Sequence, residues 1–194
     1  MLKKYFTKKF FDVYNLKFIL LVLVFAALDI VTKYLVTANL KYHESADILG
    51  EILRFTLVYN TGGIFGTFSG NLIPSTVIMF FAISLLVLLY WKENDNLGTK
   101  YAWMLVMGGA LGNFVDKLFT KSEEGWFFIF FNSDGARQGV VDFIDVDMPD
   151  FFGIPRWFTF NLADMYISIG VGLLILSMYK MRKKSHPPGP ETAK

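Results

Sequence analysis

Four long apolar runs limit what this chain can fold into. They cover residues 16–36, 72–91, 101–119 and 162–179. An α-helix rises 1.5 Å per residue, so about 20 apolar residues cross the roughly 30 Å hydrocarbon core of a bilayer. Hydrophobic residues make up 54% of the chain and charged residues 19%, a balance too apolar for a typical soluble domain. We therefore predict a mainly α membrane protein with four transmembrane helices.

The first apolar run follows a basic, aromatic-rich segment, as the apolar part of a cleaved signal peptide would. This run continues past Ala26 and Ala27 into Leu28, Ile30 and Val31, however. A continuous run of this length favours an uncleaved spanning helix.

The basic residues predict the orientation of the helices. Twelve of the 19 Lys and Arg residues lie in residues 1–17, in the 92–100 loop or in the tail from residue 180. Lys and Arg concentrate on the cytoplasmic side of membrane proteins, so both termini are expected in the cytoplasm. The long segments 37–71 and 120–160 then lie together on the outer face.

The chain is expected to form one membrane-embedded domain, residues 1–180. Alternating apolar residues in 48–59 predict a small β-rich extracytoplasmic element, and residues 120–160 predict a long outer loop. The tail 181–194 is basic and rich in proline, so we expect it to be disordered.

Composition excludes several classes of function. The chain has no cysteine and only two histidines, which argues against thiol chemistry, a metal centre or a Ser-His-Asp triad. The net charge of +2 gives no indication of a nucleic-acid partner. No cofactor is predicted.

Two aspartates with apolar neighbours, Asp142 and Asp164, are the predicted catalytic residues. Asp142 lies within Val-Val-Asp-Phe-Ile, and Asp164 opens the last apolar run. Carboxylates at the edge of a membrane are costly and often functional, and two close together can share a proton. The alternative is that Asp142 belongs to a solvated acidic loop with Asp145, Asp147 and Asp150, while Asp164 only caps a helix.

Other polar residues are predicted near the same membrane face. Asn113 and Asp116 share one helix face after a glycine-rich stretch, which alternatively is only a packing motif. Lys117 could form an interfacial ion pair with Asp116. Asp29 and Lys33 are spaced i, i+4, and either support the site or neutralise each other while Lys33 extends to the interface.

The sequence Asn60-Thr61-Gly62-Gly63-Ile64-Phe65-Gly66 predicts a glycine-rich turn. Its glycines would allow another backbone, including that of a substrate, to approach closely. The signal is weak when taken alone.

Four blocks in order resemble the lipoprotein signal peptidases, the bacterial type II signal peptidases. They are the turn at 60–66, the stretch Gly108-Gly109-Ala110-Leu111-Gly112-Asn113-Phe114-Val115-Asp116, and the segments 140–144 and 160–164. The resemblance implies an intramembrane aspartic endopeptidase of the bacterial inner membrane. Such enzymes remove the signal peptide of diacylglyceryl-modified prolipoproteins just before the lipidated cysteine, and globomycin-type antibiotics inhibit them.

The resemblance also assigns roles to residues of this chain. Asp142 and Asp164 match the catalytic pair, and the positions expected to bind substrate or support the site are Asp29, Lys33, Asn60, Gly62, Asn113, Asp116, Lys117, Asn161 and Ala163. The family usually has Arg where this chain has Lys117, which cannot make the same bidentate contacts. Gly63-Ile64 and the longer 121–138 segment also depart from the family pattern.

The predicted mechanism is general acid/base catalysis by the two aspartates, without metal, in a monomer surrounded by lipid. Two other classes remain open at this point. One is a proton- or ion-coupled carrier that uses intramembrane aspartates. The other is a non-enzymatic docking factor that uses the outer β element. The apolar segment 126–131 is predicted to rest at the interface or cover the site as a lid, unless it is an ordinary buried strand.

Overall fold

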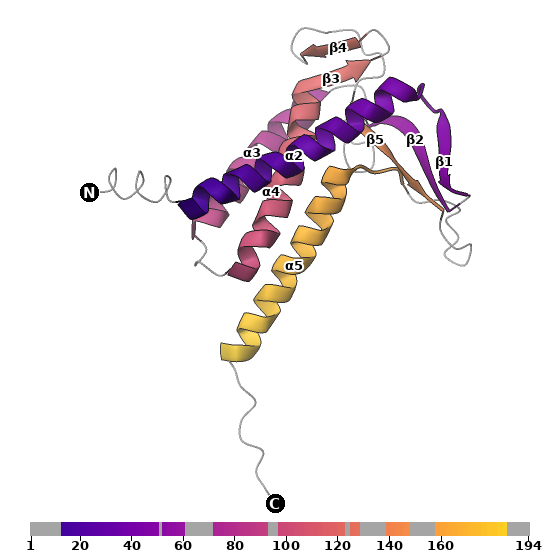
Figure 1. Cartoon of the computed structure of the whole chain (residues 1–194). Coiled ribbons are helices and arrows are strands. Elements are labelled where there is room, and N and C mark those ends of the chain that lie inside the picture. Colours follow the sequence, from indigo (N-terminus) through magenta and orange to yellow (C-terminus); the bar gives the residue numbers. More distant parts are fainter. Residues whose placement is uncertain are drawn as a thin grey trace, which may run out of the picture.

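The helices pack side by side, and a small sheet lies at one end of them (Figure 1). The computed structural model describes residues 13–50, 52–60, 72–92, 97–122, 125–128, 139–147 and 158–185. The helices are α2 (Val13–Asn39), α3 (Leu72–Lys92), α4 (Leu97–Leu118) and α5 (Leu162–Ser185). Helix α5 therefore continues past residue 180, where the sequence predicted the disordered tail to begin.

Among the described residues, three helical segments are long and apolar enough to cross a membrane: Leu16–Asn39, Ile73–Trp91 and Leu162–Lys180. Large apolar side chains on α2, α3 and α5 point away from the protein, among them Leu20, Phe81 and Ile175. Such a surface is compatible with lipid. The three apolar helices and their exposed apolar side chains support the prediction of a membrane protein.

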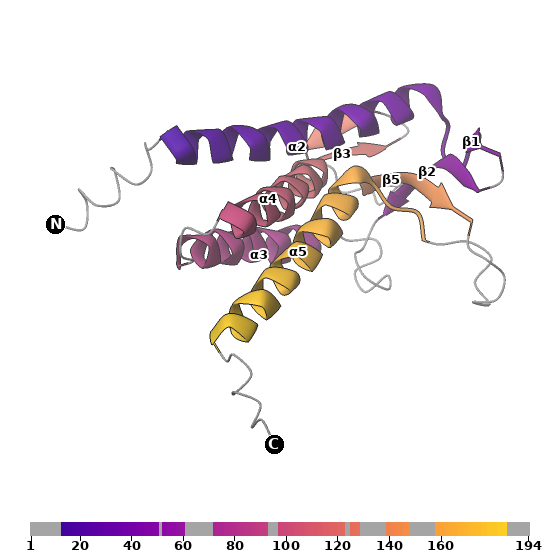
Figure 2. The ribbon, with the colours of Figure 1, turned by 60° about the horizontal axis from the view of Figure 1, so that its bottom comes forward.

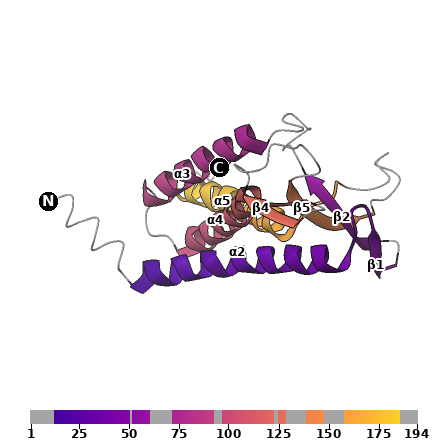
Figure 3. The same cartoon turned by 90° about the horizontal axis from the view of Figure 1, so that it is seen from above.

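Helix α4 is not among these candidate spans, although it has 22 residues. It packs against α2, α3 and α5, and the view in Figure 3 places it inside the group of helices. Its buried residues include Ala102, Val106, Ala110 and Asn113. A helix covered by its neighbours can carry glycines and polar groups such as Asn113 and Asp116, because these face protein rather than lipid.

Two small sheets form from described parts of the segments between the helices. Strands β1 (Ser45–Leu49), β2 (Leu53–Asn60) and β5 (Val140–Val146) form one antiparallel sheet in the order β1-β2-β5. Strands β3 (Phe119–Ser122) and β4 (Gly125–Phe128) form a hairpin. The sequence predicted strands near β1 and β2, but β5 was predicted as part of a polar loop. Its run of β-branched and aromatic residues was an available strand signal.

The larger sheet lies at the end of the helices where α2 ends and α5 begins (Figure 2). Its core packs Leu57, Tyr59, Val141 and Phe143 with Val36 of α2. Residues 126–128 of the predicted lid lie in β4, and residues 129–131 lie outside the described residues. The lid therefore stays a prediction.

Candidate active site

Helix packing brings the polar ends of α2, α4 and α5 together. A Cβ atom on Gly109 would overlap the carbonyl oxygen of Ala163, so only glycine lets α4 approach α5 this closely. A Cβ on Gly112 would lie 2.6 Å from Oδ2 of Asp29. The predicted packing role of these glycines is confirmed, and it serves the polar cluster at the same time.

The start of α5 joins the sheet to the helices. Phe160 pairs with β5, since its N–H donates to the carbonyl of Ile144 at 3.1 Å. The next residue, Asn161, is the N-cap of α5: its Oδ1 accepts the N–H of Asp164 at 3.0 Å, and Oδ2 of Asp164 accepts the Asn161 N–H at 3.2 Å. This reciprocal capping box fixes the Asp164 carboxylate beside β5.

Asn161 connects the two predicted catalytic aspartates. Its Nδ2 donates to Oδ1 of Asp142 at 2.7 Å, while its Oδ1 and backbone N–H hold Asp164. Asp142 also accepts a hydrogen bond from Nδ2 of Asn60 at 3.0 Å. The sequence placed Asp142 and Asp164 in one site, and the structure brings them together through a single completely buried amide side chain.

The environment of Asp142 favours its protonated form. The residue is 4% exposed, and its hydrogen-bond partners are neutral amides. Burial, and then the charge of nearby Asp164, raise the pKa of Asp142 to about 7, although the N–H groups of Asn60 and Asn161 and the charge of Lys33 oppose the rise. A carboxyl group that titrates near neutral pH is suited to donate and accept protons.

Asn113 and Lys33 complete the cluster on the helix side. Nδ2 of Asn113 donates to Oδ1 of Asp164 at 2.9 Å, and Oδ1 of Asn113 accepts from Nζ of Lys33 at 2.9 Å. Lys33 also lies 2.8 Å from Oδ2 of Asp29. The predicted Asp29–Lys33 pair is confirmed, but the alternative in which Lys33 extends to the interface is wrong, because Lys33 is 1% exposed.

Asp29 and Asp116 hold backbone groups of the site. Oδ1 of Asp29 accepts the N–H of Ala163 at 2.9 Å, which ties α2 to the first turn of α5. Oδ2 of Asp116 accepts the N–H of Val141 at 2.6 Å, next to Asp142. Asp116 lies 3.5 Å from Nζ of Lys33. The ion partner of Asp116 is thus Lys33, and the Asp116–Lys117 ion pair considered from sequence does not form.

Two of the predicted site residues have no hydrogen bond to the pair that the structure describes. Lys117 is buried and donates to Oγ of Ser75 on α3 at 3.0 Å. Gly62 lies outside the described residues. Sequence reasoning missed two partners of the buried Asp145. Nη2 of Arg54 donates to Oδ2 of Asp145 at 3.2 Å, and Oγ1 of Thr56 donates to the same oxygen at 2.8 Å. The alternative that Asp145 is a solvated neighbour is wrong.

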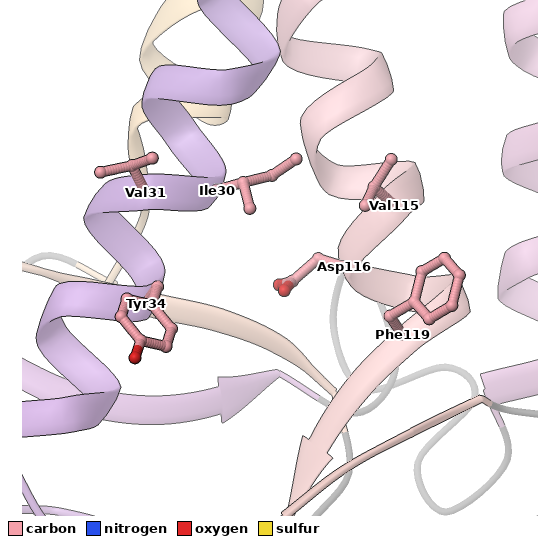
Figure 4. Close-up of a pocket in the computed structure, with 6 residues that line it drawn as sticks. All are labelled: Ile30, Val31, Tyr34, Val115, Asp116 and Phe119. Carbon is pink, nitrogen blue, oxygen red and sulfur yellow. The ribbon is translucent and has the colours of Figure 1, made fainter.

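A groove of about 370 Å³ lies between α2 and α4 beside this cluster. Ile30, Val31 and Tyr34 line one side and Val115, Asp116 and Phe119 the other (Figure 4). Its surface is apolar apart from the Tyr34 hydroxyl and Asp116. No group of side chains suited to hold a metal ion occurs in the part of the chain that the structure describes.

The fold and the cluster define a class: a membrane protein with two hydrogen-bonded aspartates at the end of its helices. The family model for signal peptidase (SPase) II matches residues 21–180. The chain is 39% identical to a lipoprotein signal peptidase of Leptospira biflexa over 172 residues, which cover 87% of this chain and 92% of that protein. A lipoprotein signal peptidase of Treponema denticola is 33% identical over 88% of this chain and 94% of its own length.

Solved structures agree with this comparison. A bacterial membrane enzyme solved in meso at 2.3 Å resolution superposes with a TM-score of 0.67 at 29% identity, covering 91% of this chain and 94% of that one. The chain belongs to the signal peptidase II family, the aspartic peptidases that remove signal peptides from lipoproteins. Membership of this family argues against the two alternative classes, the proton- or ion-coupled carrier and the non-enzymatic docking factor.

Proposed function

We propose that the enzyme cleaves diacylglyceryl-modified prolipoproteins just before the lipidated cysteine, with Asp142 and Asp164 as its catalytic pair. The observation that carries this proposal is that one residue, Asn161, donates to both carboxyl groups: its side-chain amide to Asp142 and its backbone N–H to Asp164. Two carboxyl groups in one buried network cannot both ionise easily, so the pair shares a proton. Asn60, Asn113 and Asp29 support the pair by direct or relayed hydrogen bonds.

The shared proton allows a metal-free hydrolysis. The ionised carboxylate takes a proton from water as the water oxygen bonds to the scissile carbonyl carbon. The protonated carboxyl group gives its proton to the carbonyl oxygen as the C=O double bond becomes single. In the second step the first carboxyl group passes its new proton to the leaving nitrogen, the C–N bond breaks, and one hydroxyl of the intermediate returns a proton to the second carboxylate.

The lipid part of the substrate would contact the helices. The groove between α2 and α4 supports this, because Ile30, Val31, Val115 and Phe119 offer apolar surface at the level of the cluster. An acyl chain lying there would leave the peptide on the side of β5. Ile30→Trp, which fills the groove, should raise KM for the lipidated substrate more than it lowers kcat.

The proposed topology has four spans, with α4 as the covered third helix and both termini in the cytoplasm of a bacterial inner membrane. It is supported by the basic residues in segments 1–17, 92–100 and 180–194, which include the start of α2, the connection between α3 and α4, and the end of α5. A reporter that is active only outside the cytoplasm should be silent when fused after Lys184. Activity of that fusion would place the aspartates on the opposite face and contradict the topology.

The enzyme is further proposed to act as a monomer, without a cofactor, and to bind globomycin-type inhibitors at this pair. The decisive experiment is a gel-shift cleavage assay with purified protein and two forms of one prolipoprotein, lipidated and unlipidated. Only the lipidated form should be cut, with the new N-terminus at the modified cysteine, and strong chelators should leave the rate unchanged. Equal cleavage of both forms, or loss of activity that zinc restores, would refute the proposal.

A further inference from the structure

Lys33 is a buried cation whose contacts match its chemistry. Nζ lies 2.8 Å from Oδ2 of Asp29, 2.9 Å from Oδ1 of Asn113 and 3.5 Å from Oδ2 of Asp116. An ammonium group has three N–H donors and no acceptor, and here three oxygen atoms surround it. Neutralising Asp29 requires only the first contact. The contact with Asn113 is therefore the one that needs a separate explanation.

That contact, together with a longer hydrogen bond from Asn161, fixes the orientation of the Asn113 amide. The oxygen and nitrogen of an asparagine side chain look alike and are assigned from their partners. Because Lys33 can only donate, the Asn113 atom that faces it must be the oxygen. Nδ2 of Asn113 must then face Oδ1 of Asp164, at 2.9 Å. Nδ2 of Asn161 donates to the same Asn113 oxygen at 3.2 Å, which supports this orientation.

We infer that Lys33 is a positioning residue: it acts through Asn113 to keep Asp164 as the anionic member of the pair, so that Asp142 carries the shared proton. The inference rests on the proposed function of the two aspartates. Asp164 receives N–H groups on both oxygens, from Asn113 and from the Asn161 backbone. It also lies in the first turn of α5, where the helix dipole favours a negative charge.

Asp142 also receives an N–H group on each oxygen, from Asn60 and Asn161. It lies on a strand rather than in the first turn of a helix, however, and is 4% exposed, so burial favours its neutral form. Among the residues that the structure describes, the charged groups around the pair are Lys33 and Asp29 from α2 and Asp116 and Lys117 from α4. Asp164 is the base that takes the proton from water, and Asp142 is the acid that protonates the carbonyl oxygen.

The wild-type protein provides the first test. Carboxyl signals of ¹³C-aspartate-labelled protein in detergent are assigned from the signals missing in Asp142→Asn and Asp164→Asn. At pH 6 the Asp164 signal should be that of a carboxylate, and the Asp142 signal that of a carboxylic acid. The opposite order would overturn the inference, and this measurement does not depend on whether any Lys33 variant folds.

Lys33→Met tests the relay itself, because methionine keeps the apolar stem and removes the charge and the donors. The acidic limb of the kcat–pH profile, which reports ionisation of the pair, should move up by about one pH unit. The basic limb should move less, since only Asp164 loses its oriented donor. At pH 6, kcat should fall about tenfold with little change in KM. Lys41→Met, which removes the same charge from an exposed position, should keep the wild-type profile.

The paired variant Asp29→Asn/Lys33→Met removes both charges, so it avoids leaving the Asp29 carboxylate buried without its cation. It should show the same shift of the acidic limb. Equal movement of both limbs would mean a general charge effect, and a lower kcat with unmoved limbs would mean a structural role. Either result overturns the inference while the proposed function stands. Cleavage by Asp142→Asn or Asp164→Asn at the wild-type rate would instead refute the proposed function.

Discussion

The two ends of strand β5 each carry a buried aspartate, but the two side chains have different partners. Asp145 lies opposite Arg54 of β2, with the guanidinium Nη2 at 3.2 Å, and accepts from the Thr56 hydroxyl at 2.8 Å. Within the described part of the chain, Asp142 accepts from the neutral amides of Asn60 and Asn161.

The two aspartates differ in whether a positively charged side chain neutralises the carboxylate. A carboxylate with a guanidinium partner is held in one protonation state and ties two strands together. A carboxylate that faces neutral amides and a second carboxylate keeps a proton that it can exchange. Alternation of side chains along β5 places Asp142 and Asp145 on opposite faces, so one strand serves both purposes. The register of β2 shifts between Phe55 and Val58, a local irregularity of the kind often found next to active sites.

The largest expected effect comes from the pair itself. Asp142→Asn or Asp164→Asn keeps shape and hydrogen-bonding capacity but removes the titratable proton, so cleavage should fall by about 10³-fold or more. The double variant should be no worse than either single variant, because the two groups act as a unit. Initial rates on a lipidated prolipoprotein measure both. A near wild-type rate in either single variant would show that the substituted aspartate is not catalytic.

A second prediction concerns the close approach of α4 to α5. Gly109→Ala would place a Cβ against the Ala163 carbonyl and within 2.9 Å of Cγ1 of Ile167, which displaces the start of α5. Because Asn113 and Asp164 would separate, kcat should fall by roughly 10- to 100-fold. Gly172→Ala on α5 is the matched control, since no atom lies within 4 Å of its Cβ position. An equal loss in both variants would point to a general effect on helices.

The third prediction is the pH dependence above neutrality. With the pKa of Asp142 raised to about 7, the carboxyl group is protonated below that pH and loses its proton above it. The rate should therefore decline above about pH 7, approaching a tenfold fall per pH unit. The native state binds more protons than the unfolded state between about pH 4 and pH 7, so Asp142 makes the free energy of unfolding decrease as pH rises through this window.

Rates and melting temperatures across pH 4–9 check both statements. In Asp142→Asn this decrease in stability should disappear. A rate that stays constant to pH 9 would show that Asp142 does not supply the proton.

The smallest effect on activity is expected at the other end of the strand. Asp145→Asn should keep most of the cleavage activity but lower the free energy of unfolding by about 1–2 kcal/mol, because Arg54 loses its charged partner. The expected loss of stability is small because the Arg54 side chain is 30% exposed, so water screens the ion pair. Thermal unfolding with and without Arg54→Gln measures the coupling, and the two changes should be less than additive. A loss of activity as large as that of Asp142→Asn would remove the contrast between the two ends.

Local features of the sequence predicted a large part of this protein. Hydropathy indicated each of the helices, because apolar runs of membrane length need no distant partner to be recognised. The positions of Asp29, Asn113, Asp142 and Asp164 at matching helix or loop ends predicted that they meet. The motif blocks predicted the family, which the comparisons confirm, while the catalytic pair that they indicate stays a prediction.

Tertiary structure alone decided the partners of those residues. Lys33 contacts an amide 80 residues away, and Asp29 caps a helix 134 residues away. The pairing of β5 with β2 decided that Arg54 faces Asp145 and that Asn60 reaches Asp142. The physical reason is that a buried charge is stabilised by whichever groups packing brings near it. Spacing along the chain predicts neighbours only within one helix or strand, so the sequence could name these carboxylates but not the groups that hold them.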